Sequence, residues 1–418
     1  MTHIIRSDAF FELFVTLGPD QPSRRPVAVA LGLIVVLCLT PSAEEEVAFR
    51  LCLICEGQGL SDVVLNVLLY VPLGFALRHG GASLPRVIAA GFLVSLGVEA
   101  LQLVIPGRFT SPADLAANTL GGGLGWFLAF DPGMWLRPRE GVRRYLSWGW
   151  ACLASALVVL SCAALRPVLP EGQIFVGWTP DLGGHAQYPG SVVDASVDGE
   201  PLPSARPISP QALQRFESGG RVHVRFTFHP VGQTLAPVLQ VTAGDYGEAL
   251  MIGMRDDDVV IRRRLRSAEL RMATPEVVFS GPWEVAAGDS WDLEFMMDGD
   301  GRYLLTARGP NHSASYVDGI GSERGWSVWH YPPGLPAWFE TIIDLVWILV
   351  LVAPAAFWAR SWPMAVGAGA LPLATTAAAP LFTAALVPSP ALLLWGCVVV
   401  VAGAGLGMSE RVSPRGST

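Results

Sequence analysis

Polar side chains that could do chemistry interrupt otherwise apolar stretches between residues 62 and 118. They are three carboxylates, three amides and one guanidinium, namely Asp62, Asn66, Glu99, Gln102, Arg108, Asp114 and Asn118. Ionisable groups are expensive inside hydrocarbon, so such a set is a functional-site hypothesis by default. Glu99 or Asp114 could act as a general base, and the guanidinium could hold a phosphate or a carboxylate.

Helical spacing brings these residues onto shared faces. Asp62 and Asn66 are four residues apart, as are Asp114 and Asn118, and this step places each pair on one side of a helix. Glu99 lies about 10 Å below the end of its own helix at the usual helical rise. We therefore expect three helices and one loop to bring the seven residues together on one side of a membrane.

Composition indicates a membrane protein. Hydrophobic residues make up 51% of the chain and charged residues 15%, values that suit a multi-span protein better than a soluble enzyme. The formal net charge of -8 argues against a nucleic-acid partner. The polar set contains no histidine and the chain has no HExxH motif, so we expect neither a metal nor a cofactor.

Apolar runs predict eight membrane helices, each judged against about 30 Å of hydrocarbon. They cover residues 26–41, 61–78, 85–105, 112–130, 146–166, 338–358, 363–386 and 389–408. The first lies between Pro26 and Pro41 and is short for a span. The second to fourth carry the polar residues, so these helices should face one another rather than lipid.

Arginine placement predicts the orientation, because positive charge gathers in cytoplasmic loops near helix ends. Alternate connections hold Arg6, Arg24, Arg25, Arg78, Arg86, Arg137, Arg139, Arg143, Arg144, Arg360, Arg411 and Arg415. We therefore expect a multi-pass protein of the bacterial inner (plasma) membrane with both termini in the cytoplasm. The segment from about 170 to 336, and the polar set, would then lie on the outer side.

The outer segment has a different pattern. Apolar and polar residues alternate over residues 221–229 and 291–295, as half-buried strands require. Residues 256–258 and 298–301 are Asp- and Gly-rich turn signals between such runs, which predicts hairpins. The expected fold class is a multi-span α-helical membrane protein with an inserted extracytoplasmic all-β sandwich of the jelly-roll type.

The strand order of this segment resembles concanavalin A-like domains of the laminin G type, carried by residues 249–253, 288–295 and 298–308. The resemblance implies carbohydrate binding, in some members with calcium, although we interpret residues 298–301 as a hairpin turn. Two sets of side chains could serve a ligand, and core packing or a solvated strand is the commoner role for each. They are the tryptophans Trp283, Trp291, Trp326 and Trp329 and the arginines Arg262, Arg263, Arg264 and Arg266.

The N-terminal part resembles the VanZ-like family over about residues 26–166. The matching elements are Asp62-x3-Asn66, Pro72-x-Gly74, Ser95-x3-Glu99-x2-Gln102, Arg108, Asp114-x3-Asn118 and Gly121-Gly122. The family is named after a determinant of glycopeptide resistance. Its members usually carry further acidic residues between the positions of Arg108 and Asp114, and this chain has none there. That departure weakens any role that needs paired carboxylates at this turn.

The resemblance implies a cell-envelope membrane protein but no settled reaction. The polar set itself favours an outward-facing site that binds or modifies an envelope lipid or glycan precursor and could affect glycopeptide susceptibility. The alternatives are a membrane-anchored carbohydrate-binding module without catalysis and a transporter, and the residues do not decide whether the chain is an enzyme. The expected partners are membrane lipid and an envelope glycan or lipid-linked precursor. The expected domains are residues 1–168 (five helices), 169–336 (β-sandwich) and 337–418 (three helices and a tail).

Overall fold

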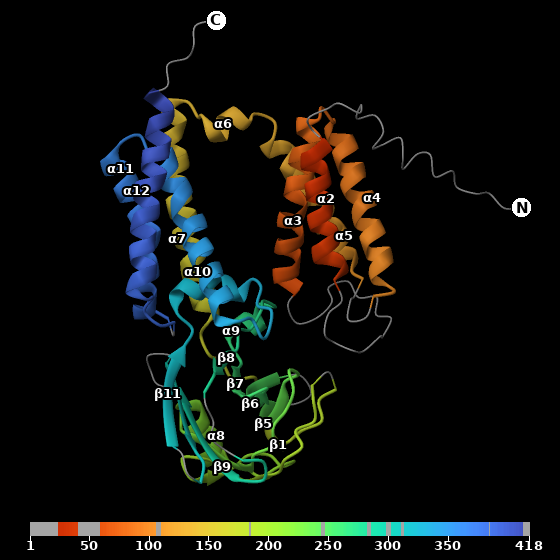
Figure 1. The fold of residues 1–418 in the computed structure, drawn as a ribbon, viewed down its shortest axis with the longest axis vertical. Coiled ribbons are helices and arrows are strands. Elements are labelled where there is room, and N and C mark those ends of the chain that lie inside the picture. The colour runs from red at the N-terminus through yellow and green to blue at the C-terminus, as the bar shows by residue number, and fades with distance from the viewer. Residues whose placement is uncertain are drawn as a thin grey trace, which may run out of the picture. The chain divides into compact units, whose positions relative to one another are not determined.

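Apolar runs in hydrocarbon must satisfy every backbone N–H and C=O internally, and this chain does so with helices. The computed structural model describes residues 24–40, 59–105, 110–183, 185–243, 247–281, 286–297, 302–310, 313–383 and 385–412. The chain divides into two compact units, residues 1–138 (unit 1) and residues 139–418 (unit 2), whose elements are labelled in Figure 1.

Unit 1 is helical. Its helices are α2 (Arg24–Leu39), α3 (Gly59–His79), α4 (Leu84–Gln102), α5 (Pro112–Leu128) and the short α6 (Pro132–Leu136). Helix α3 packs most closely on α5 because glycines line the crossing. A Cβ atom on Gly121 or Gly125 would collide with a carbonyl oxygen of α3, and one on Gly74 would collide with the backbone of Gly122. Such small residues let membrane helices approach at backbone distance.

Six helices of the described residues are long and apolar enough to cross a membrane. They are α3 and α4 of unit 1 and α7 (Glu140–Ala164), α10 (Ala337–Trp358), α11 (Trp362–Ala378, continued by the 3-10 turn η2, Ala379–Leu381) and α12 (Pro390–Val412) of unit 2. All eight expected helices are present, but α2 and α5 have only 16 and 17 residues. The chain is therefore a multi-pass membrane protein with six candidate spans among the described residues, and the spanning role of α2 and α5 remains a prediction.

In unit 2, α7 packs against α10 and α11, and α10 packs against α12. Arg143 lies within α7 rather than in the preceding loop, where the sequence placed it, and is 7% exposed. Its guanidinium donates to the backbone oxygens of Phe357 at 3.0 Å and Gly407 at 2.9 Å. A cation at the carbonyl end of α10 offsets the negative pole of that helix. Arg143 therefore ties three helix ends together.

This packing divides the chain at a different place from the expected boundary at residue 168. Helix α7 was grouped with the first four membrane helices, whereas its contacts are with the last three. Side-chain bonds reinforce that association, since Ser147 donates to the carbonyl oxygen of Ala355 at 2.7 Å. The three-domain division remains a prediction, and the described packing joins α7, the β segment and α10–α12 in one unit.

The segment between α7 and α10 forms two antiparallel sheets. Their strands are β1 (Ile174–Trp178), β2 (Val192–Val197), β3 (Glu200–Pro201), β4 (Val222–Thr227), β5 (Ala236–Ala243), β6 (Gly247–Arg255), β7 (Asp258–Arg263), β8 (Val277–Phe279), β9 (Ser290–Met297), β10 (Arg302–Arg308) and β11 (Ser313–Gly319). The sheet orders are β1-β5-β6-β7-β8 and β11-β10-β9-β4-β2-β3. Three short helices accompany them, α8 (Pro210–Glu217), α9 (Arg266–Glu269) and the 3-10 helix η1 (Ser322–Val328).

Alternation along the strands produces the core. Val222, Val224 and Phe226 of β4 are buried and belong to the same cluster as Ile252 of β6 and Ile261 of β7. One hydrophobic core therefore serves both sheets. The prediction of membrane helices with an inserted β part is confirmed by the six apolar helices and the two sheets between α7 and α10. The jelly-roll connection remains a prediction.

Both expected hairpins have paired strands. β6 pairs with β7 across the turn at residues 256–258, and β9 pairs with β10 across residues 298–301, which lie outside the described residues. The strand boundaries could be read from the sequence because each turn signal separates two runs of period two.

Of the four tryptophans considered for sugar stacking or core packing, two are deeply buried. Trp291 and Trp326 are 1% and 7% exposed, so sugar stacking is wrong for these two. Trp329 donates its indole N–H to the Ser161 hydroxyl at 3.0 Å. Trp283 lies outside the described residues. Trp291, Trp326 and Trp329 therefore pack in the core and at its junction with the helices, which is the commoner use of large aromatic rings.

The run of arginines does not form one patch on β7. Arg262 makes a two-pronged contact with Glu248, with 3.1 Å between its Nε and the carboxylate Oε1. The neighbouring Arg263 points to the other face, where its guanidinium lies 6.0 Å from the centre of the Phe216 ring. Burial lowers the pKa of Arg263. Because adjacent strand residues face opposite sides, an anionic polymer could not meet both.

Candidate functional site

The polar residues of α3, α4 and α5 gather near one end of these helices. We call Asn66, Tyr70, Glu99, Asp114 and Asn118 the polar cluster. Glu99 is 5% exposed, Asn118 2% and Tyr70 0%, whereas Asn66 and Asp114 are half-buried. The cluster is thus mostly screened from solvent, and its members come from three different helices.

Glu99 is held at the start of α5. Its Oε2 accepts a hydrogen bond from the backbone N–H of Ser111 at 3.0 Å. Ser111 is also the N-cap of α5, because its hydroxyl accepts from the N–H of Ala113 at 3.1 Å and Pro112 follows it. Anionic groups are stabilised at a helix N-terminus, where free N–H groups and the helix dipole both point at them. The position favours a carboxylate at residue 99.

A second carboxylate lies in the first turn of α5. The Asn66 side chain interacts with Asp114, and Asp114 is near enough to Glu99 for the two charges to repel each other. None of the salt bridges among the described residues involves either acid. The cluster therefore brings two acids together with amides and a backbone N–H as their described partners.

Two buried polar atoms complete the cluster. The Asn118 side-chain amide donates to the Ser95 hydroxyl at 2.9 Å. Asn118 Oδ1 and the Tyr70 hydroxyl are both buried without a hydrogen-bond partner among the described residues. The Ser95 hydroxyl also interacts with the Tyr70 hydroxyl, so the Asn118 and Tyr70 side chains share this neighbour. Buried polar groups are nearly always fully satisfied, so two incompletely bonded atoms around one serine call for an explanation.

The model of the VanZ/LLP1 family matches residues 27–136. This confirms the resemblance expected from the sequence, and the match covers α3 to α6, most of α2 and the whole polar cluster. No curated protein and no solved structure matches the chain. We refer to residues 27–136 as the VanZ-like region.

The other three expected site residues of the VanZ-like region are not among the five that we call the polar cluster. Gln102 donates its side-chain amide to the carbonyl oxygen of Cys38 at 3.0 Å, so it ties α4 to α2. Asp62 lies in the first turn of α3, half-buried and two turns before Tyr70. Arg108 lies outside the described residues. The VanZ-like region thus unites four of the seven expected residues: Asn66, Glu99, Asp114 and Asn118.

The VanZ-like cluster offers both acceptors and donors to a ligand. Carboxylate oxygens, the Asn118 carbonyl and the Tyr70 hydroxyl could bind hydroxyl or amide groups, and a carboxylate could also take a proton. Groups of three or more His, Cys, Asp or Glu suited to a metal ion do not occur among the described residues. The cluster therefore combines hydrogen-bond acceptors, donors and two acids within one mostly buried group.

Sequence reasoning missed Tyr70 and Ser111. Tyr70 follows Asn66 by one helical step of four, so its position on the same face could have been read from the pattern. Ser111-Pro112 is an N-cap signal, since serine is favoured at that position and proline directly after it. Both side chains are neutral at pH 7 and carry only a hydroxyl group, so they stood out less than the acids, amides and arginine around them.

A second polar centre, also missed, lies in unit 2. We call Arg324, Trp326, Tyr331, Glu340 and Asp344 the arginine-bridged network. Arg324 reaches Glu340 at 3.1 Å and Asp344 at 3.7 Å. The indole of Trp326 donates to Asp344 at 2.7 Å, and the Tyr331 hydroxyl donates to Glu340 at 3.1 Å. Glu340 and Asp344 are four residues apart on α10, which is the signal that could have revealed them.

The residues around this network are also paired. Arg255 of β6 forms a two-pronged ion pair with Glu276, and Glu276 also accepts from the N–H of Gly334 at 3.3 Å. Burial and the neighbouring Glu340 and Glu276 carboxylates raise the pKa of Tyr331, so its phenol stays protonated and can donate. The network joins the β segment to the start of α10 and has the features of a structural tie.

Proposed function

We propose that the polar cluster of the VanZ-like region binds the headgroup of an envelope lipid precursor at the outer face of the plasma membrane. The observation that carries this proposal is the pair of buried polar atoms, Tyr70 Oη and Asn118 Oδ1, without described partners next to two carboxylates. Burying such groups without a partner costs about 1–3 kcal/mol each. Hydrogen bonds from a bound ligand would offset this penalty.

The orientation in this proposal follows the arginine pattern. Both termini lie in the cytoplasm, and the ends of α3, α4 and α5 that carry the cluster lie outside. Arg108, in the connection between α4 and α5, is the residue we assign to an anionic group of the ligand, because a guanidinium binds phosphate or carboxylate in two-pronged fashion. A headgroup with both hydroxyl and phosphate groups matches this combination of acceptors and cation.

Catalysis is a second candidate role for the same residues. Two neighbouring carboxylates, one in a largely apolar site, are suited to general-base work. The absence of the extra acidic residues before Asp114 favours binding over paired-carboxylate chemistry. In that case the protein would bind the lipid precursor without changing it covalently, and glycopeptide susceptibility would change because less precursor is free.

The test is the lipid that co-purifies with the protein. Wild-type protein, Glu99→Gln and the control Glu140→Gln are extracted in mild detergent and their lipids identified by mass spectrometry. Glu140 is an exposed acid paired with Arg360 at 2.7 Å. We expect a phosphate- or sugar-bearing lipid to be enriched with wild type and the control and depleted at least about tenfold with Glu99→Gln, the effect of losing one charge-assisted hydrogen bond. Equal lipid profiles in all three would refute the proposal.

A further inference from the structure

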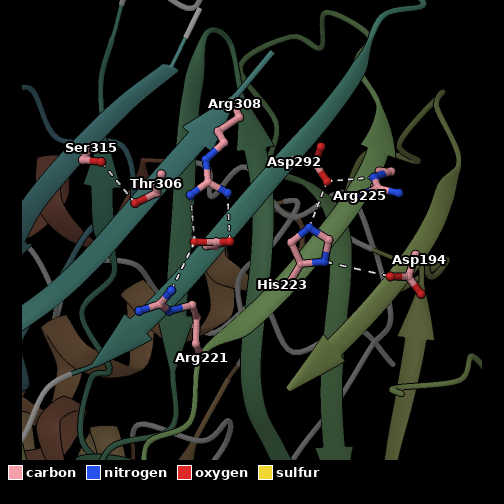
Figure 2. A network of polar contacts seen from close by, with 9 residues as sticks. Asp194, Arg221, His223, Arg225, Asp292, Thr306, Arg308 and Ser315 are labelled. Atoms are coloured by element: carbon pink, nitrogen blue, oxygen red, sulfur yellow. Dashed lines mark hydrogen bonds and ion pairs between the residues drawn. The ribbon is translucent and has the colours of Figure 1, made fainter. Parts of the chain in front are cut away.

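The charged side chains on one face of the six-stranded sheet are paired with one another. Asp292 accepts a hydrogen bond from Arg225 at 2.8 Å. Glu294, on the same strand, pairs with Arg308 at 2.9 Å and with Arg221 at 3.6 Å. Figure 2 shows these side chains linked across neighbouring strands. Each of these three arginines therefore lies beside a carboxylate.

Four other arginines of unit 2 come together where the spanning helix α7 ends. We call them the junction arginines, and they are Arg166, Arg264, Arg266 and Arg271. The N–H of Arg266 donates to the carbonyl oxygen of Arg166 at 2.7 Å, and the N–H of Val168 donates to the carbonyl oxygen of Arg264 at 3.1 Å. Helix α9, which begins at Arg266, also packs against α7 (Figure 1). These contacts hold the junction arginines at the boundary between the spanning helices and the β segment.

The junction arginines have no carboxylate partner among the described residues. None of the salt bridges of the described part of the chain includes any of the four. The acids nearest to them in the sequence, Glu171 and Glu269, are both exposed, so four positive charges stand against two negative ones. Arg264 is half-buried, and its Nε is buried without a hydrogen-bond partner among the described residues. Buried donors are nearly always satisfied, so this one points to an acceptor from outside the chain.

Exposed apolar side chains lie beside the junction arginines. The Arg166 guanidinium donates to the carbonyl oxygen of Phe382, in the connection between α11 and α12. Phe382 and the preceding Leu381 are 70% and 78% exposed, and Leu270, next to Arg271, is 44% exposed. At the end of a spanning helix, apolar side chains contact lipid acyl chains while arginines extend to the headgroups. The surface therefore offers a lipid both an apolar and a cationic contact.

We propose that the junction arginines bind the phosphate of an anionic phospholipid, in the membrane leaflet on the side of the β segment. Guanidinium groups bind phosphate oxygens through pairs of N–H donors, and basic groups between membrane helices hold anionic headgroups. A soluble anion fits this surface less well, because it leaves Leu381 and Phe382 without an apolar contact. The lipid anchors the β segment at the membrane surface. The site lies in unit 2 and uses no residue of the polar cluster, so it does not depend on the function proposed for that cluster.

The test titrates the full-length protein in mild detergent with phosphatidylglycerol or phosphatidylcholine and measures bound lipid by native mass spectrometry. Wild type is compared with the double variant Arg264→Gln/Arg266→Gln. The matched control is Arg225→Gln/Arg308→Gln, which removes the same charge from the paired side chains of the sheet face. The titrations are repeated in proteins that also carry Glu99→Gln, so that lipid held by the polar cluster is recognised by its loss. Thermal unfolding shows whether each variant is folded.

We expect wild type and the control to bind phosphatidylglycerol at least about tenfold more tightly than phosphatidylcholine, with or without Glu99→Gln. The double variant should lose at least about tenfold in affinity for phosphatidylglycerol alone, as expected for the loss of a hydrogen bond to a charged group. The proposal is overturned by equal binding of the two lipids to wild type, by an unchanged affinity in the double variant, or by an equal loss in the control. A preference that disappears with Glu99→Gln, or inorganic phosphate that displaces the lipid at equal concentration, also overturns it. If the double variant unfolds, Arg266→Gln/Arg271→Gln decides, because both of its side chains are exposed.

Discussion

The polar cluster of unit 1 and the arginine-bridged network of unit 2 are both buried groups that contain two acids near helix ends. They differ in the partners that their carboxylates have. In the network, Arg324 joins Glu340 and Asp344, and an indole and a phenol donate to the same carboxylates. In the cluster, Glu99 and Asp114 have no described cation, while Tyr70 Oη and Asn118 Oδ1 have no described partner. The five residues of the network are all paired and hold elements together, and the unpaired buried oxygen nearby, Glu323 Oε2, lies outside this set. The cluster contains its unpaired atoms among its own members, which suits a ligand.

The largest expected effect is on the network. Arg324→Leu leaves Glu340 and Asp344 as uncompensated buried charges, which should reduce the free energy of unfolding by about 3–5 kcal/mol. Membrane abundance should fall with it. The control is Arg360→Leu, which removes an exposed pair with Glu140 and should change stability by less than about 1 kcal/mol. Equal unfolding temperatures for the two variants would contradict the structural role of the network.

The next effect concerns pH and Glu323, at the edge of the network. Burial, with a smaller contribution from Asp344, raises the pKa of Glu323 to about 7. Because the folded pKa exceeds that of the unfolded chain, its contribution to stability is complete below the unfolded pKa and is lost as the pH rises through about 7. The unfolding temperature should therefore fall as the pH rises from the unfolded pKa of Glu323 to about 7. Glu323→Gln should make this fall smaller. An identical pH profile for wild type and Glu323→Gln would refute this assignment.

A smaller effect on stability is expected in the cluster. Glu99→Gln keeps an oxygen that can accept from the Ser111 N–H, so the unfolding free energy should change by only about 1 kcal/mol. Glycopeptide susceptibility of cells should nevertheless change to that of cells lacking the protein. If Glu99 were a structural partner, abundance would fall as it does for Arg324→Leu. Normal abundance with unchanged susceptibility would count against both roles.

Much of the division into membrane helices, β segment and polar cluster could be predicted from the sequence. Hydropathy indicated helices at all eight expected places, and six of them are long and apolar enough to cross a membrane among the described residues. Period-two alternation with turn signals indicated the strands around residues 256–258 and 298–301. Helical spacing brought Glu99, Asp114 and Asn118 to one site. These features depend on local periodicity, which a single sequence contains.

What could not be predicted depends on contacts between distant residues. The tie from Gln102 to Cys38 spans 64 residues, and that from Arg143 to Gly407 spans 264. No local sequence pattern predicts a contact between residues so far apart, so the association of α7 with α10–α12 was not predicted. The core position of Trp291 was open for the same reason, because a strand tryptophan fits either face until the partner sheet is known.

The most direct test makes the same change in both regions. Tyr70→Phe removes a buried hydroxyl without a described partner, and Tyr331→Phe removes one that donates to Glu340. Unfolding temperature and co-purified lipid are measured for both. We predict that Tyr70→Phe raises stability by about 1 kcal/mol yet loses the bound lipid, while Tyr331→Phe lowers stability and keeps the lipid. A Tyr70→Phe protein that is destabilised, or that retains its lipid at the wild-type level, would contradict the claim that the cluster is a ligand site.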